Sequence, residues 1–301
     1  MGLAALSRLD VKDVTIRNGT IALLDRRTGE REELTKVALT LSLPRLGGAF
    51  SAEGTEVWHG EPIAFSIRLD HPEMLARQSG RSGLTVALTA KPVSFRLTGG
   101  VTNAMSGPVL APIVDGKAVI AMPSLRDFVR WSGRDMDLPP RGFGALTLNG
   151  AVRMQNGIAQ FGDIVLTLDA VKATGTLTLD ANATMPTVAG ALRIGMLDFT
   201  PYLPPPVEGW STRAFDTAIF RQFNADLAIA ADGAKFRRLE AGKTDAAIHL
   251  KDGKLAVDIR AMSLYRGQAK GNMTLDANGP EAAVTGDGTV SGVDLGALLR
   301  E

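Results

Sequence analysis

Three histidines are the first side chains to test for chemistry, because an imidazole can act as a general base or bind a metal. His59, His71 and His249 lie far apart in the chain and share no metal-ligand spacing. His59 follows Trp58 at an expected turn, and His249 alternates with apolar neighbours, which predicts the polar face of a strand. We therefore expect no histidine metal site.

The segment Asp135-Met136-Asp137 is the only tight acidic pair outside predicted turns. A metal site there would need further oxygen ligands, and Arg134 and Arg141 are simpler partners for these carboxylates. The chain has no Gly-x-Ser-x-Gly elbow and no Gly-rich phosphate loop. Cysteine is absent, which excludes disulfides, thiol catalysis and Cys-based zinc sites. The sequence therefore predicts no catalytic site, no metal and no cofactor.

A carbohydrate-active or hydrolytic β enzyme is one alternative, and it would need paired carboxylates in a cleft. Asp180, Asp252 and Asp276 instead occupy predicted turns, and aromatic platforms for sugars are scarce among 11 Phe, 3 Trp and 2 Tyr. We expect a protein that is not an enzyme.

The composition of the 301 residues supports a folded chain of balanced charge. Hydrophobic residues make up 45%, and 33 basic against 32 acidic residues give a net charge of +1, which argues against a general nucleic-acid binder. No run of 18 apolar residues occurs, so we expect no membrane-spanning helix. The 33 glycines predict frequent turns.

Alternation of apolar and polar residues dominates the chain, and this period of two is typical of half-buried strands. It predicts about fifteen short antiparallel strands, joined by two-residue turns at Asn18-Gly19, Asp115-Gly116, Asn156-Gly157 and Asp252-Gly253. We expect a mainly β fold: a long curved antiparallel sheet or meander, forming an open groove or an incomplete barrel. Short helices are predicted at residues 72–78, 124–131, 198–203, 217–223 and 294–299.

The chain also repeats itself, because residues 150–203 and 246–299 align at a constant offset of 96 with 14 identities in 54 positions. The shared block Thr-Leu-Asp-Ala-Asn begins at Thr178 and at Thr274, and a weaker third copy is suggested near Trp58. Pro139-Pro140 and Pro204–Pro206 interrupt the pattern. We expect three β-repeat regions, at residues 1–138, 139–206 and 207–301, the last apparently truncated.

These repeats resemble the AsmA family of bacterial envelope proteins, which belongs with the bridge-like lipid-transfer proteins. The resemblance is carried by Gly175–Ala181 and its partner Gly271–Ala277, and by the Leu192–Phe199 segment with Pro201-Tyr202-Leu203. The stretch from Leu264 to Gly271 looks like the family's aromatic-x-Gly-x-x-x-Gly strand pair.

The resemblance implies a periplasmic, β-rich body attached to the inner membrane by an N-terminal transmembrane helix, supporting outer-membrane assembly. In the family the concave face of the sheet is apolar and is thought to carry phospholipid acyl chains. This chain has no such anchor helix, so we expect a fragment of a longer protein. The implied partners are phospholipids, and the inner membrane through the missing anchor.

The alternation itself leaves two uses open for the apolar side chains: an open lipid groove or an ordinary closed core. Each buried acyl methylene contributes about 0.8 kcal/mol, so a groove needs no polar signature residues. A structural scaffold or protein-binding platform without lipid remains the other hypothesis. The groove candidates are Val37, Leu39, Leu41, Ile63, Phe65, Ile67, Leu177, Leu179, Leu255 and Val257.

Overall fold

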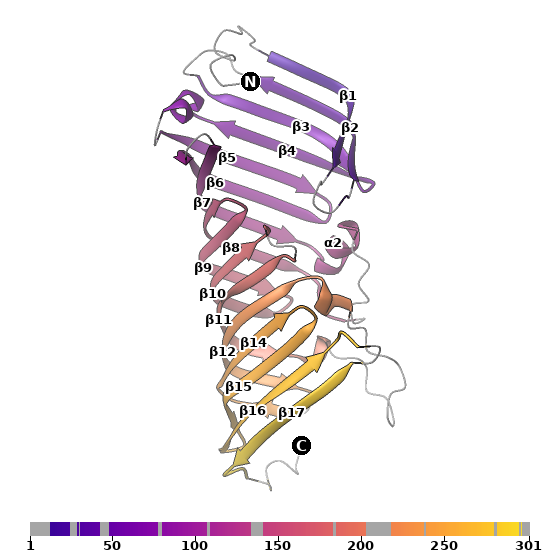
Figure 1. Cartoon of the computed structure of the whole chain (residues 1–301), viewed down its shortest axis with the longest axis vertical. Coiled ribbons are helices and arrows are strands. Elements are labelled where there is room, and N and C mark those ends of the chain that lie inside the picture. The colour runs from indigo at the N-terminus through magenta and orange to yellow at the C-terminus, as the bar shows by residue number, and fades with distance from the viewer. Residues whose placement is uncertain are drawn as a thin grey trace. The chain divides into compact units, whose positions relative to one another are not determined.

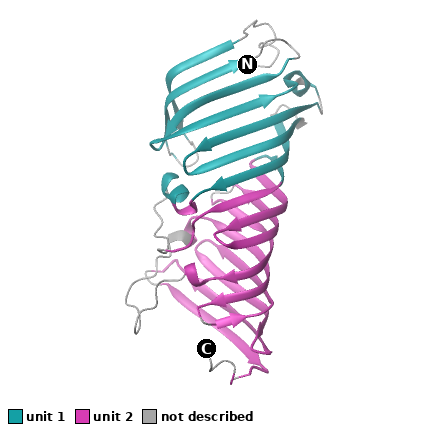
Figure 2. Ribbon diagram, turned by 180° about the vertical axis from the view of Figure 1, so that it is seen from behind, with its two compact units in different colours: residues 1–123, 127–134, 151–156 teal, residues 124–126, 135–150, 157–301 magenta. Residues whose placement is uncertain are grey.

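A computed structural model shows a mainly β protein with 17 strands and one described α-helix (Figure 1). Two compact units divide the chain (Figure 2): unit 1 is residues 1–123, 127–134 and 151–156, and unit 2 is the rest. The described residues are 13–24, 29, 31–42, 48–77, 80–106, 109–133, 141–182, 185–202, 218–237, 239–279, 282–294 and 296.

Unit 1 contains an open antiparallel meander in which each strand pairs with the next along the chain. This confirms the antiparallel meander that the alternation predicts. Its strands are β1 (Asp13–Leu24), β2 (Arg31–Ser42), β3 (Phe50–Trp58), β4 (Glu61–Leu69), β5 (Arg81–Ala90), β6 (Val93–Ser106) and β7 (Val109–Met122).

Unit 2 continues the antiparallel pattern with one exception, the parallel pairing of β11 with β12. The strand β8 (Leu146–Gln155) begins in unit 2 and ends in unit 1. The others are β9 (Ile158–Leu168), β10 (Val171–Asp180), β11 (Thr187–Asp198), β12 (Asn224–Phe236), β13 (Leu239–Ala241), β14 (Thr244–Lys251), β15 (Lys254–Leu264), β16 (Gly267–Asp276) and β17 (Ala283–Ser291).

The parallel pair was not expected. The strands β11 and β12, on either side of Pro204–Pro206, pair directly along their length. Parallel neighbours need a crossover rather than a tight turn. The prolines themselves lie outside the described residues.

The short helices agree in place with most of the expectations. The structure has α2 (Leu125–Trp131) and the 3-10 helices η1 (Pro72–Ala76), η2 (Thr200–Tyr202) and η3 (Ala218–Arg221). Each helix lies within its predicted segment and is shorter than that segment. The helix expected at residues 294–299 lies almost wholly outside the described residues.

Two of the four predicted hairpin turns are correct and two are wrong. Asn156-Gly157 and Asp252-Gly253 join strands with positive φ at both residues, as a type I′ turn requires. Asp115-Gly116 instead lies inside β7, where Gly116 pairs with Gly99 and their backbones approach too closely for a Cβ atom. Asn18-Gly19 lies inside β1, where Asn18 has a φ of 52° and the register shifts. Gly116 therefore allows two strands to pack closely, and Gly19 lies at a bulge.

The 96-residue repeat is confirmed strand by strand, since β8 to β11 correspond to β14 to β17. Asp180 pairs with Thr187 across β10 and β11, and Asp276 pairs with Ala283 across β16 and β17, each 96 residues further on. Asp180 also pairs with Ile158, and Asp276 with Lys254. The repeated sequence therefore encodes a repeated register.

The shared Thr-Leu-Asp-Ala-Asn block in the middle of the repeat closes a turn in both copies. The backbone NH of Asn182 donates to the Asp180 carboxylate at 2.9 Å, and that of Asn278 donates to Asp276 at 3.1 Å. The side-chain amide of Asn278 then reaches the Asp252 carbonyl at 2.8 Å. This block links neighbouring hairpins and has a structural role.

The strands of unit 2 bend along their length, so that parts of them lie toward the viewer and fainter parts lie behind (Figure 1). Register shifts accompany the bend between Gly175 and Leu177, between Asp245 and Ala246, and on β15 after Ile259. An extra residue in one strand of a pair bends and twists that strand. Unit 2 is therefore a curved sheet rather than a flat one.

Candidate functional site

The apolar residues of unit 1 form continuous rows across its seven strands. Residues paired across neighbouring strands lie on the same face of a sheet, so the registers define each row. The first row is Ile16, Leu39, Gly54, Phe65, Leu88, Phe95 and Ile120. The second is Val14, Leu41, Ala52, Ile67, Val86, Leu97 and Ala118.

Four of the predicted groove residues of unit 1, Leu39, Leu41, Phe65 and Ile67, lie in these two rows and are half-buried. The other two, Val37 and Ile63, are buried, with 1% and 5% of their surface exposed. A half-buried side chain in a row is shielded mainly by its neighbours. The sequence therefore placed all six candidates on strands, and the structure brings four of them into shared rows.

Unit 2 has matching rows across eight strands, from β9 to β17. One is Phe161, Leu177, Gly190, Leu227, Ile248, Val257, Met273 and Gly286. The next is Ala159, Leu179, Val188, Ala225, Leu250, Leu255, Leu275 and Val284.

All four predicted groove residues of unit 2 fall in these two rows. Leu177, Leu255 and Val257 are half-buried, while Leu179 is 40% exposed. Buried residues gather near the bend, where Ala173, Ile194 and Ala231 form a core cluster. We call the rows of each unit its apolar face.

Within each unit the described strands pair with their neighbours to form one sheet. Part of each apolar face is nevertheless buried: Ala52, Leu97 and Ala118 in unit 1, and Phe161, Ala225 and Leu250 in unit 2. In unit 1, Phe128 and Trp131 of α2 pack on a cluster of Ile63, Ala90 and Val93. The helix therefore covers one small area of that apolar face.

The opposite faces are polar or carry small side chains. In unit 1 a row of Thr15, Thr40, Glu53 and Ser66 runs beside a shallow hollow of about 650 Å³. Most of its lining residues belong to this polar face, although Leu39 and Phe65 also contribute. Unit 2 has a smaller hollow of about 250 Å³, lined by Arg193, Asp232, Lys243, Asp245 and others.

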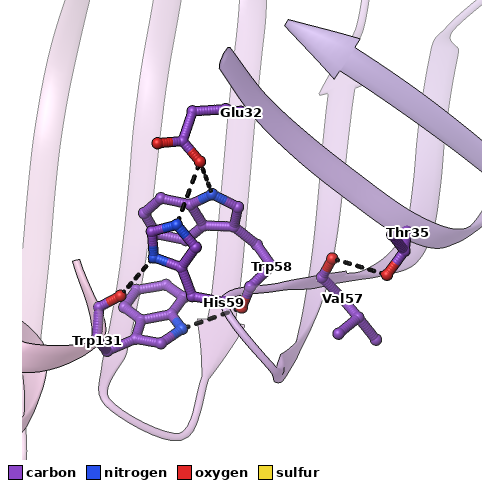
Figure 3. A network of polar contacts seen from close by, with 6 residues as sticks. All are labelled: Glu32, Thr35, Val57, Trp58, His59 and Trp131. Atoms are coloured by element: carbon purple, nitrogen blue, oxygen red, sulfur yellow. Dashed lines mark hydrogen bonds and ion pairs between the residues drawn. The ribbon is translucent and has the colours of Figure 1, made fainter. Parts of the chain in front are cut away.

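A polar network fixes α2 over unit 1 (Figure 3). Glu32 accepts a hydrogen bond from the Trp58 indole NH at 2.8 Å and lies 3.2 Å from His59 Nε2. His59 Nδ1 lies 2.7 Å from the Trp131 carbonyl oxygen, and the Trp131 indole NH donates to the Trp58 carbonyl at 3.1 Å. Trp58 also stacks on His59 and meets Trp131 edge-on.

This network gives His59 a structural role. The residue has a φ of 45° and forms the β3–β4 turn with Gly60, as the sequence predicted for a turn residue. Sequence reasoning missed its partners, because Glu32 and Trp131 are 27 residues before and 72 residues after it in the chain. No sequence motif connects these three positions.

The carboxylate of Glu56 lies on the apolar side of unit 1. Glu56 pairs with the buried Ile63, and burial raises the pKa of Glu56 above its ordinary value. An ionised group loses hydration at such a place. Glu56 is therefore the charged residue that most directly borders the apolar face in unit 1.

The other two histidines each lie near a single carboxylate. His249 lies 3.1 Å from Asp226 on the polar face of unit 2, and His71 lies 3.5 Å from Glu73. Asp135 and Asp137 lie outside the described residues. Among the residues that the structure describes, no group of three His, Asp or Glu side chains could hold a metal ion.

In the part of the chain that the structure describes, no helix has both the length and the apolar character needed to cross a bilayer. No protein-family model matches the chain, and comparison with curated proteins and with solved structures finds no similar protein.

Proposed function

We propose that this chain is a non-catalytic module of AsmA type that binds phospholipid acyl chains along the apolar faces of its sheets. The resemblance of the repeats suggests the setting: the periplasm of a bacterial envelope, in a parent protein attached to the inner membrane. The proposed role is to conduct phospholipid and so support outer-membrane assembly.

The observation that carries the proposal is the continuity of the apolar rows. In unit 2 each row crosses eight strands without a polar side chain, and Leu179, Met273 and Val284 in these rows are exposed. Contiguous apolar surface that is exposed in this way can mark a binding site. A monolayer sheet with one apolar face suits a ligand that is itself apolar and long.

The energetics favour acyl chains as that ligand. Each methylene taken out of water contributes about 0.8 kcal/mol, so ~14 carbons contribute on the order of 10 kcal/mol before ordering costs. No specific polar contact is required for such binding.

The test compares substitutions on the two faces of a single strand. Leu179 lies on the apolar face of β10, and Thr178, next to it, lies on the polar face in a row with Gln160 and Ala189. Leu179→Asp places a charge where acyl chains would lie, while Thr178→Asp is the matched control. Leu179 is already 40% exposed, so Leu179→Asp should fold. Thr178 is half-buried, and the melting temperature of each variant checks its folding.

Native mass spectrometry of each purified protein, with lipid extraction of the same sample, provides the measurement. We expect bound phospholipid in the unchanged protein and in Thr178→Asp, and a clear loss in Leu179→Asp with an unchanged melting temperature. Equal lipid content in the two variants, or a folded protein without lipid, would overturn the proposal. The second outcome would favour a scaffold or protein-binding platform.

A further inference from the structure

His59 contacts a hydrogen-bond acceptor with each of its two ring nitrogens (Figure 3). Nδ1 lies 2.7 Å from the Trp131 carbonyl oxygen, and Nε2 lies 3.2 Å from the Glu32 carboxylate. A carbonyl oxygen only accepts hydrogen bonds, and so does an ionised carboxylate. A neutral imidazole has one N–H group to donate, whereas the imidazolium has two. The geometry therefore suits a protonated His59, which can donate to both partners at once.

Two further contacts favour a positive charge on this ring. The Trp58 indole stacks on the His59 ring with the ring centres 4.1 Å apart, and the face of an indole attracts a cation. Trp131 is the last residue of α2. The last carbonyl groups of a helix lack partners within the helix, and basic side chains commonly bind them. The protonated His59 ring therefore links the end of α2 to the β3–β4 turn.

The charged groups at this corner of unit 1 come from three elements. Strand β2 supplies Glu32, which also accepts the Trp58 indole NH at 2.8 Å. The β3–β4 hairpin supplies Glu61, which pairs with Trp58 in register. On α2, Arg130 and Asp127 lie 3.2 Å apart and form an ion pair with each other. Among the described residues, the ion pair recorded for the imidazole is therefore the one with Glu32.

From these contacts we propose that His59 is a pH-sensitive switch that holds α2 on the sheet of unit 1 while its ring is protonated. The imidazolium bridges the Glu32 carboxylate on β2 and the Trp131 carbonyl on α2. When the proton leaves, one ring nitrogen presents a lone pair to an acceptor, so one of the two contacts becomes repulsive. An imidazole exchanges its proton near neutral pH. The contact with α2 therefore forms as the pH falls and is lost as the pH rises.

Release of α2 would uncover part of the apolar face of unit 1. Phe128 and Trp131 pack on the cluster of Ile63, Ala90 and Val93, yet none of the seven residues of α2 is itself buried. The helix therefore gains little from burial of its own side chains, and its polar contacts matter for its attachment. The pH response needs no lipid. Only its consequence, that acyl chains reach Ile63 once α2 is released, rests on the proposed function.

NMR of the lipid-free protein tests the switch directly. Nuclear Overhauser contacts between the Trp131 ring and the methyl groups of Ile63, Ala90 and Val93 report whether α2 is in place. We expect these contacts at about pH 5.5 and their loss at about pH 8.5, on either side of the range in which an imidazole titrates. The 15N shifts of the His59 ring should show two protonated nitrogens at the lower pH and one at the higher. Contacts that persist at the higher pH would overturn the proposal.

Three variants assign the response to this pair of side chains. His59→Asn removes the imidazole and keeps a residue type that tolerates the φ of 45°, so the Trp131 contacts should be lost at both pH values. Glu32→Gln supplies an amide that can donate to the unprotonated nitrogen, so the contacts should persist at both. His249→Asn is the matched control, because His249 lies 3.1 Å from Asp226 in unit 2, and it should keep the full response.

A pH response that survives in His59→Asn or in Glu32→Gln, or one that disappears in His249→Asn, would overturn the proposal. Because these spectra are recorded without lipid, their outcome is independent of the Leu179→Asp test. The switch and the proposed function can therefore fail separately.

Discussion

The two copies of the 96-residue repeat have the same strand registers and different burial. In the first copy, Ile194 on β11 is 6% exposed and belongs to a core cluster. Its counterpart Val290 on β17 is 62% exposed. The cause is the number of neighbours, because β11 pairs with β10 and β12 while β17 pairs with β16 alone among the described strands. Sequence similarity preserved the pairing, and position in the sheet set the burial.

The largest contrast should appear when these two side chains are shortened. We expect Ile194→Ala to lower the free energy of unfolding by about 2–4 kcal/mol, because it leaves a cavity in the cluster with Ala173 and Ala231. Val290→Ala should change it by no more than about 0.5 kcal/mol. Urea denaturation followed by circular dichroism measures both values. Similar losses would contradict the assignment of β17 as an exposed edge.

The two copies should also differ in how much stability they lose when an equivalent glycine is replaced by alanine. Gly175 has a φ of 146°, and a Cβ atom there would clash with the Ala191 carbonyl oxygen. We expect Gly175→Ala to cost about 1–3 kcal/mol of stability through backbone strain. Gly271, its counterpart, has no positive φ, although a Cβ atom there would also clash, with the Asp287 carbonyl oxygen of β17. The substitution at Gly271 therefore lacks the contribution from backbone strain. Denaturation of both variants should show a smaller loss for Gly271→Ala, and a reversed order would refute this reasoning.

The turn formed by the shared block should behave alike in the two copies. Asn278→Ala removes the hydrogen bond to the Asp252 carbonyl, and we expect a loss of about 1 kcal/mol in the free energy of unfolding. Asn182, at the equivalent place, lies against Gly157, so Asn182→Ala should have a similar effect. Thermal melts of the two variants check the equality. A loss in only one of them would mean that the shared block has different roles.

A smaller, pH-dependent difference should arise at Asp276. Hydrogen bonds from Lys254 and from the backbone NH of Asn278 lower the pKa of Asp276 below its ordinary value of 3.8. The first copy has Ile158 where the second has Lys254. Because the pKa of the folded state is lowered, the stabilisation is complete above pH ~4 and is lost as the pH falls through the folded-state pKa.

The variant Lys254→Ile makes the second copy like the first. We expect the pKa of Asp276, measured by NMR titration of its carboxyl carbon, to move back toward 3.8 in this variant. Stability should then depend less on pH below pH ~4. An unchanged titration curve would show that the backbone NH of Asn278, rather than Lys254, controls this carboxylate.

Local patterns in the sequence predicted most of the fold. Alternation predicted the strands, and the turns Asn156-Gly157 and Asp252-Gly253 predicted hairpins, because both depend on residues close together in the chain. The hairpin turns predicted at Asn18-Gly19 and Asp115-Gly116 were wrong, since a glycine inside a strand can also lie at a bulge or at a close backbone approach. Which of these roles a glycine has depends on the neighbouring strand.

The candidate surface was predictable in part for the same reason. Alternation placed Leu39, Phe65 and Leu177 on one side of their strands, but it could not reveal the rows that strand pairing creates. The parallel pairing of β11 with β12 extends the rows of unit 2 across the crossover. Nor could the sequence show that Trp131 covers Ile63, because that contact joins distant segments.

The central claim is that acyl chains lie along the apolar faces, and photocrosslinking locates them most directly. A phospholipid with a diazirine in its acyl chain would be bound, irradiated and mapped by mass spectrometry of the peptides. We predict labels on the apolar face, at Leu39, Leu177 and Leu179, and few on Thr40 or Thr178 of the same strands. Equal labelling of the two faces, or labels confined to the polar face, would contradict the account.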